Sequence, residues 1–210
     1  MAVKSIFKPT ANWRNLYFYR KTDALYQLTV VFCKRFLPPY GDRTVDQMVQ
    51  AARSGKQNIV EGCEDGKTST EMEIKLLNVA RSSIGELRED YEDYLKSHAL
   101  QIWASGHPRF GDLLAFCRAH NDYADYAPIA AKADDEEFCN MCITLCRMVD
   151  KMMVAYLEKA ERQFVTEGGI RERMHAARTG YRQEQDARLA ALEQENGYLK
   201  ELLKQHGIEF

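Results

Sequence analysis

The sequence predicts an all-α protein: an antiparallel up-and-down four-helix bundle with an additional short helix and a C-terminal helical, coiled-coil-like tail. Apolar residues recur three and four positions apart over several stretches that are too long for strands, which is the spacing of one helix face. Proline and glycine clusters separate these stretches, at Pro38-Pro39, between Gly62 and Gly66, and at Gly168-Gly169. Long amphipathic helices joined by short connections are typical of a bundle.

The 210 residues divide into three predicted parts. Residues 1–19 form an N-terminal aromatic arm, residues 20–166 form the four-helix bundle, and residues 167–210 form a connector followed by a zipper-like helix. The start of the chain lacks the apolar core of a secretory signal, and no run approaches the roughly 18 apolar residues of a membrane span. We therefore expect a cytoplasmic protein with no membrane contact.

The first two helices are predicted from their apolar stripes. The first runs from Arg20 to Leu37, and its stripe is Leu25, Leu28, Phe32 and Phe36. It ends at the proline pair, because proline cannot continue a helix. The second follows Gly41 and carries Val45, Met48, Ala52, Ile59 and Cys63 at helical spacing. Its small residues from Ala51 to Gly55 predict a neighbouring helix that approaches closely. A glycine inside a helix costs about 1 kcal/mol relative to alanine, so Gly55 indicates a packing need that outweighs this cost.

The third and fourth long helices follow the same pattern. Thr68 and Glu71 match the capping box of a helix start, and the stripe of the third helix is Leu77, Ala80, Ile84, Leu87, Tyr91 and Tyr94. A short amphipathic stretch from Phe110 to about Tyr126 is predicted to end before Pro128. The fourth long helix carries Phe138, Cys142, Leu145, Val149, Met152 and Tyr156 in register.

The tail contains a short leucine repeat. If Leu189 is an a position, successive a and d positions are Leu189, Leu192, Asn196, Leu199 and Leu203. An asparagine at a fixes the register of parallel two-stranded coiled coils. The repeat spans only about two and a half heptads, below the three to four that identify a coiled coil. Pairing between copies, docking against the bundle, and a lone helix all stay open.

Charge is unevenly distributed along the chain. Residues 1–60 carry 10 basic and 3 acidic groups, whereas residues 61–140 carry 8 basic and 17 acidic groups. Such a division favours either an anionic partner or oppositely charged helices side by side. The candidate contacts for RNA, DNA or another partner are Arg20, Lys21, Lys34, Arg35, Arg53 and Lys56. The alternative for these cations is an ordinary solvated surface.

No motif predicts an enzyme. The sequence offers no catalytic set, no cofactor-binding loop and no histidine pair at metal spacing. Cys139, Cys142 and Cys146 have C-x2-C-x3-C spacing, but a structural zinc site normally takes four ligands, usually from two separated pairs. Because these cysteines share an apolar helix face, buried thiols are the favoured interpretation over a metal or redox centre.

The run A-A-R-S-x-x-x-N-I-x-E-G from Ala51 to Gly62, with S-x-x-E-L from Ser83 to Leu87, resembles the four helix bundle family. That family includes proteins encoded in 23S rRNA intervening sequences and the accessory variability protein of diversity-generating retroelements. The segment GGIRERMHAARTGYR further resembles the suffix found on some of those bundles. The resemblance covers roughly residues 20 to 182.

The resemblance implies a small non-enzymatic homo-oligomer, often a pentamer; the tail would instead favour a dimer. In the retroelement members it also implies a basic surface that engages nucleic acid and a reverse transcriptase. Those relatives are strongly basic, whereas this chain has a pI near 6.2, which leaves room for a local basic patch only. The polar motif residues Asn58, Glu61, Ser83 and Glu86 have either a structural role or a partner contact.

Three function classes follow. The first is a non-enzymatic oligomeric helical-bundle adaptor that binds a protein or nucleoprotein partner through its surface. The alternative is a nucleic-acid-binding accessory protein of a reverse-transcriptase system resembling a diversity-generating retroelement. The third is a cysteine-centred metal or redox protein.

Overall fold

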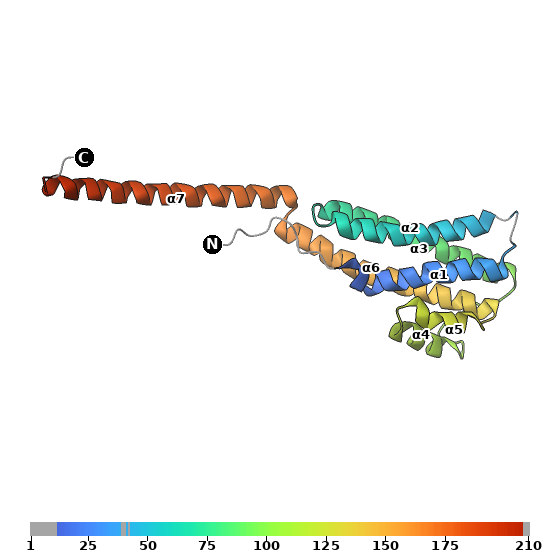
Figure 1. The fold of residues 1–210 in the computed structure, drawn as a ribbon. Helices are drawn as coiled ribbons and strands as arrows, with labels where there is room; N and C mark the ends of the chain where they lie inside the picture. The colour runs from blue at the N-terminus through green and yellow to red at the C-terminus, as the bar shows by residue number, and fades with distance from the viewer. Residues whose placement is uncertain (1–11, 39–40, 42, 208–210) are drawn as a thin grey trace. The chain divides into compact units, whose positions relative to one another are not determined.

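A computed structural model describes residues 12–38, 41 and 43–207. Within these ranges the chain is all-helical and contains no strand (Figure 1). A short 3-10 turn, η1 (Trp13–Asn15), comes before the first long helix. The α-helices are α1 (Tyr17–Phe36), α2 (Arg43–Asp65), α3 (Thr70–Ser97), α4 (Phe110–Ala119), α5 (Tyr123–Ala130), α6 (Asp135–Glu167) and α7 (Ile170–Gln205).

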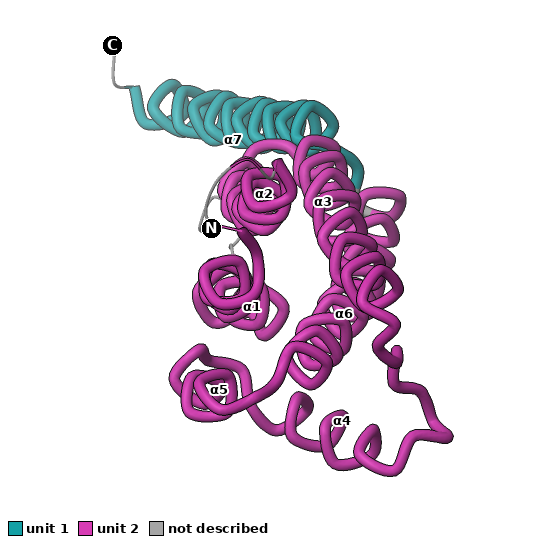
Figure 2. Tube along the Cα trace, turned by 90° about the vertical axis from the view of Figure 1, so that its right-hand side faces the viewer, with its two compact units in different colours: residues 1–7, 167–210 teal, residues 8–166 magenta. Residues whose placement is uncertain are grey.

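The described residues fall into two compact units (Figure 2). The larger unit, magenta in Figure 2, ends at Thr166 and contains α1 to α6 packed against each other. In this unit α2 packs along α3 and α1, and α1 also contacts α5. Helix α6 meets α1 where the rings of Phe32 and Phe138 lie 5.6 Å apart. It meets α3 through a salt bridge of 2.8 Å between Arg81 and Asp150.

The predicted stripes form the core of this unit. Fully buried side chains from each of the long helices meet there: Leu25, Leu28, Phe32, Met48, Ile59, Leu77, Ile84, Leu87, Tyr91, Phe138, Cys142, Leu145 and Val149. The Tyr91 hydroxyl donates a hydrogen bond of 3.0 Å to the Thr29 hydroxyl, so even the polar end of this core residue has a partner. The periodicity of the sequence therefore identified the buried faces of α1, α2, α3 and α6.

Helix α1 begins earlier than the sequence predicts, at Tyr17 rather than Arg20. Phe18 is buried and its ring packs edge-on to Tyr156 of α6, with 5.4 Å between ring centroids, so the aromatic segment adds a turn to the helix. The predicted arm of residues 1–19 is thus partly helix α1 and partly η1. Its first residues, 1–11, lie outside the described part of the chain.

Helices α2 and α3 approach closely at the small residues, as predicted. A Cβ built on Gly55 would lie 2.7 Å from Cδ1 of Ile84 on α3, so no larger residue fits without moving its neighbour. The N-cap of α3 is Ser69 rather than Thr68: the Ser69 hydroxyl accepts from the Met72 amide at 3.1 Å. Thr68 instead donates to the Asp65 carbonyl at 3.1 Å, which places it in the preceding turn.

The region from Phe110 to Tyr126 contains two helices, not one, and the predicted end before Pro128 is wrong. The chain leaves the helix at His120 and starts α5 after Asp122, which takes the extended conformation of an N-cap. Pro128 then lies inside α5, which continues to Ala130. One carbonyl at its end, that of Ala130, accepts from the Arg35 side chain of α1, so a contact from outside the helix supports its last turn.

The smaller unit, teal in Figure 2, contains α7. Gly168 has φ of +72°, a conformation that suits glycine, and it ends α6. The basic segment after Gly169, predicted to be a connector, is helical from Ile170 onward. A single helix runs through it and the leucine repeat, and none of its residues is buried.

No helix in the described part of the chain is long and apolar enough to cross a membrane.

Candidate functional site

The predicted basic residues of α1 mostly bind the chain itself. Lys21 is fully buried, and its ammonium group donates to the carbonyl oxygens of Cys117 and His120 at the end of α4. Burial lowers the pKa of Lys21, because desolvation penalises the charged form. A cation at the C-terminus of a helix also complements the helix dipole. Lys21 is therefore removed from the predicted contact surface.

Arg20 and Arg35 also bind groups at the ends of α5. The Arg20 guanidinium donates to both carboxylate oxygens of Asp122 at the start of α5, with 2.8 Å from Nε to Oδ1. This hydrogen bond raises the pKa of Arg20 and lowers the pKa of Asp122. Arg35 donates to the carbonyls of Ala130 and Ala133, the latter at 3.0 Å. Three cations of α1 thus fasten α4 and α5 to the core.

The remaining basic candidates are spread over two helices. Lys56 of α2 forms a salt bridge of 2.7 Å with Asp23 of α1 and lies over the Tyr26 ring, 5.1 Å from its centroid. Lys34 and Arg53 are exposed. Four of the six predicted cations bind other groups of the same chain. The structure therefore does not bring the six together into one basic patch.

The polar motif residues divide into two groups. Asn58 donates to the Ser54 carbonyl at 2.9 Å, and the Ser83 hydroxyl donates to the Ser54 hydroxyl at 3.0 Å, which joins α2 to α3. Glu61 and Glu86 are exposed. A polar groove of about 460 Å³ runs beside this contact; its lining residues are Arg43, Asp46, Gln47, Gln50, Ala51, Ser54, Ser83 and Glu86. Ser83 therefore supports the α2–α3 contact and Asn58 binds within α2, whereas Glu86 faces the groove.

All six cysteines are buried thiols. Desolvation raises the pKa of Cys63 and of Cys117 to about 12, and it raises the pKa of Cys139, Cys142 and Cys146 as well. The thiolate is the form that attacks or binds a metal, so these protonated thiols are poorly suited to either role. In the described ranges, no three His, Cys, Asp or Glu side chains are grouped so that they could hold a metal ion.

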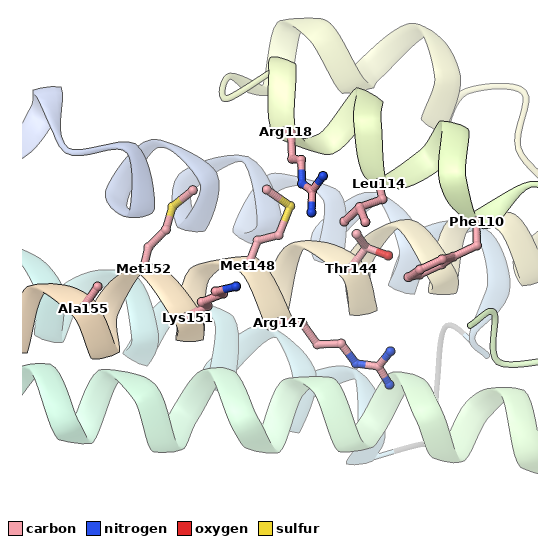
Figure 3. A pocket seen from close by; sticks show the side chains of 9 residues that line it. All are labelled: Phe110, Leu114, Arg118, Thr144, Arg147, Met148, Lys151, Met152 and Ala155. Carbon is pink, nitrogen blue, oxygen red and sulfur yellow. The ribbon is translucent and has the colours of Figure 1, made fainter. Parts of the chain in front are cut away.

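The structure contains a second groove that the sequence did not predict. It has a volume of about 550 Å³ and lies between α4 and α6 (Figure 3). The lining residues are Phe110, Leu114 and Arg118 of α4 with Thr144, Arg147, Met148, Lys151, Met152 and Ala155 of α6. Phe110, Leu114 and Arg118 are spaced four residues apart, which places them on one face of a helix and indicates one wall of the groove. The opposite wall could be assigned only once the packing of α4 on α6 was known.

The leucine repeat of α7 is open to solvent. Leu189 is 57% exposed, and Leu192 and Leu199 are each 49% exposed. Leu203 is half-buried, and Asn196 in the same stripe is exposed. The predicted tail residues therefore share one helical element that presents apolar side chains to water.

Comparisons with models of protein families, with curated proteins and with solved structures find no significant match to this chain.

Proposed function

We propose that this protein is a non-enzymatic oligomeric adaptor. In this proposal α1, α2, α3 and α6 form the antiparallel four-helix bundle that the resemblance implies, and the stripe on α7 joins copies of the chain. The surface of the bundle then binds a protein or nucleoprotein partner. The single observation that carries the proposal is the exposed leucine stripe of α7.

The stripe supports pairing because a long helix with an uncovered apolar face is rarely stable alone; most helical stability comes from packing. Leu189, Leu192 and Leu199 are about half exposed, and full burial of a leucine contributes about 1.5–3 kcal/mol. Completing this burial on two helices gains roughly 5–9 kcal/mol, close to the lower estimates of the cost of association. We therefore expect a weak, concentration-dependent pair.

Asn196 supports a parallel arrangement of that pair. It occupies an a position in the stripe, where two asparagines from parallel helices hydrogen-bond across the interface. In the same register Arg188 faces Glu193 and Glu195 faces Lys200 of the other helix, both with opposite charges. A ring of five, which the resemblance implies, would need a separate contact between bundles.

The chemistry-bearing side chains also favour an adaptor over the other two classes. The buried, protonated thiols do not suit a redox or metal centre. Nucleic-acid binding needs several cations that converge on phosphates. Four of the six predicted cations bind other groups of the chain, which leaves the exposed Lys34 and Arg53. The nucleic-acid-binding accessory role stays as the alternative proposal, with a smaller set of contacts than the sequence predicts.

A cysteine-scanning experiment on the full-length chain tests the pairing. We expect Asn196→Cys to form an interchain disulfide under mild oxidation, because a positions of a parallel pair face each other. Gln194→Cys, on the outer face of the same helix, is the matched control and should stay largely uncrosslinked. The six native thiols are buried, so background reaction should be low. Equal crosslinking of both variants, or of neither at concentrations up to about 1 mM, would contradict the proposed interface.

A further inference from the structure

The groove between α4 and α6 combines an apolar floor with unneutralised positive charge. Phe110 and Leu114 line it from α4, and Met148 and Met152 from α6 (Figure 3). Methionine side chains are flexible and polarisable, so they adapt to ligands of different shape. A groove of about 550 Å³ lies within the range of small-molecule sites.

Three cations border this floor, and no acidic residue is among the described residues that line it. The cations are Arg118, Arg147 and Lys151. Arg147 forms a salt bridge of 3.0 Å with Glu92, and Glu92 also lies 3.6 Å from Arg88, so a single carboxylate is shared between two arginines. Within the described ranges, neither Arg118 nor Lys151 forms a salt bridge. The groove therefore has a net positive charge beside a hydrophobic surface.

The charge and polarity of the groove point to its ligand. We propose that the α4–α6 groove binds a small amphiphilic carboxylate, such as a medium-chain fatty acid, with its chain along Met148 and Met152 and its carboxylate between Arg118 and Lys151. Arginine and lysine form strong charge-assisted hydrogen bonds with carboxylates. The lining along α6 spans Thr144 to Ala155, about 16 Å of helix, which suits an elongated chain.

A partner helix with acidic side chains is the other candidate occupant, and at about 10 Å across it is wider than an extended chain. A single acyl chain is narrower and its carboxylate can remain near solvent, beside the exposed Arg118 and Lys151.

The test uses the full-length protein and displacement of a fluorescent fatty acid, dansyl-undecanoic acid. We expect saturable binding at one site and displacement by dodecanoate. Hexanoate should be at least about tenfold weaker because it buries less apolar surface, and dodecylamine should not compete because its charge is repelled. Equal competition by dodecanoate and dodecylamine would indicate non-specific partition into apolar surface and would overturn the proposal.

Matched variants locate the site. Arg118→Glu with Lys151→Glu should weaken dodecanoate binding by at least about tenfold, whereas Lys132→Glu, an exposed cation elsewhere in the unit, should leave it unchanged. Leu114→Trp fills the groove without changing its charge and should also abolish binding; circular dichroism checks that each variant is folded. Unchanged affinity in both groove variants overturns the proposal, as does binding of an acidic peptide but not of dodecanoate. The outcome of this binding test does not depend on pairing through α7, because the groove residues and α7 belong to different units.

Discussion

Lys21 shows how a residue that looks like a surface contact can be a structural one. Its ammonium group occupies the end of α4, where helix carbonyls lack partners within the helix. Arg35 binds carbonyls at the end of α5 in the same way, and Arg20 binds Asp122 at its start. The positive charge of α1 is thus used largely to hold two short helices that would be marginal in isolation.

Lys21→Met tests this role. We expect the free energy of unfolding to fall by about 1–3 kcal/mol, because the Cys117 carbonyl loses its buried charged donor. For a chain of this size that corresponds to a decrease in melting temperature of roughly 2–12 °C. Lys34→Met, the same change at an exposed position of the same helix, is the control and should be close to neutral. Equal melting temperatures for the two variants would contradict the capping role.

At the scale of elements, α2 and α3 fit closely against each other at Gly55. Gly55 allows the α2 backbone to meet Ile84, and the hydroxyls of Ser54 and Ser83 are hydrogen-bonded at 3.0 Å close by. Gly85, one residue beyond Ile84, has open space where a Cβ would lie, with no neighbouring atom within 4 Å, and so has no such packing reason. Two glycines on facing helices therefore have opposite expected responses to substitution.

Gly55→Ala and Gly85→Ala form a matched pair. Alanine favours a helix over glycine by up to about 1 kcal/mol, so Gly85→Ala should stabilise the protein. Gly55→Ala should destabilise it, because overpacking costs about 1–3 kcal/mol and outweighs the same gain. Chemical denaturation followed by circular dichroism measures both. If the two variants change stability in the same direction, the close approach at Gly55 is not limiting.

At the scale of the whole molecule, the core holds ionisable groups that remain protonated in the folded state. Burial raises the pKa of Cys63 and Cys117 from 9.0 to about 12 and that of Tyr94 from 10.0 to about 12. In the unfolded chain these groups lose their protons at lower pH. The folded state therefore binds more protons in alkaline solution, which makes stability depend on pH.

The sign of this dependence gives a prediction. The contribution of each buried thiol is complete below pH 9, where both states are protonated, and it is lost as the pH rises from 9 towards 12. Each such group steepens the fall in unfolding free energy by up to about 1.4 kcal/mol per pH unit. Urea denaturation at a series of pH values measures the slope of unfolding free energy against pH. Cys63→Ala should make this slope shallower by about the contribution of one titrating group. A slope that Cys63→Ala leaves unchanged would contradict the burial of this thiol.

The sequence by itself determined the helical class, the buried stripes, the break at Gly168-Gly169 and the leucine repeat. These features depend on residues close together in the chain, through the period of the helix and the local effects of proline and glycine. Only the tertiary structure decided that Lys21 and Arg35 cap α4 and α5, and that Phe110 and Leu114 face Met148 across a groove. These contacts join residues about 30 to 100 positions apart, and the spacing of residues along one helix does not specify which other helix it meets.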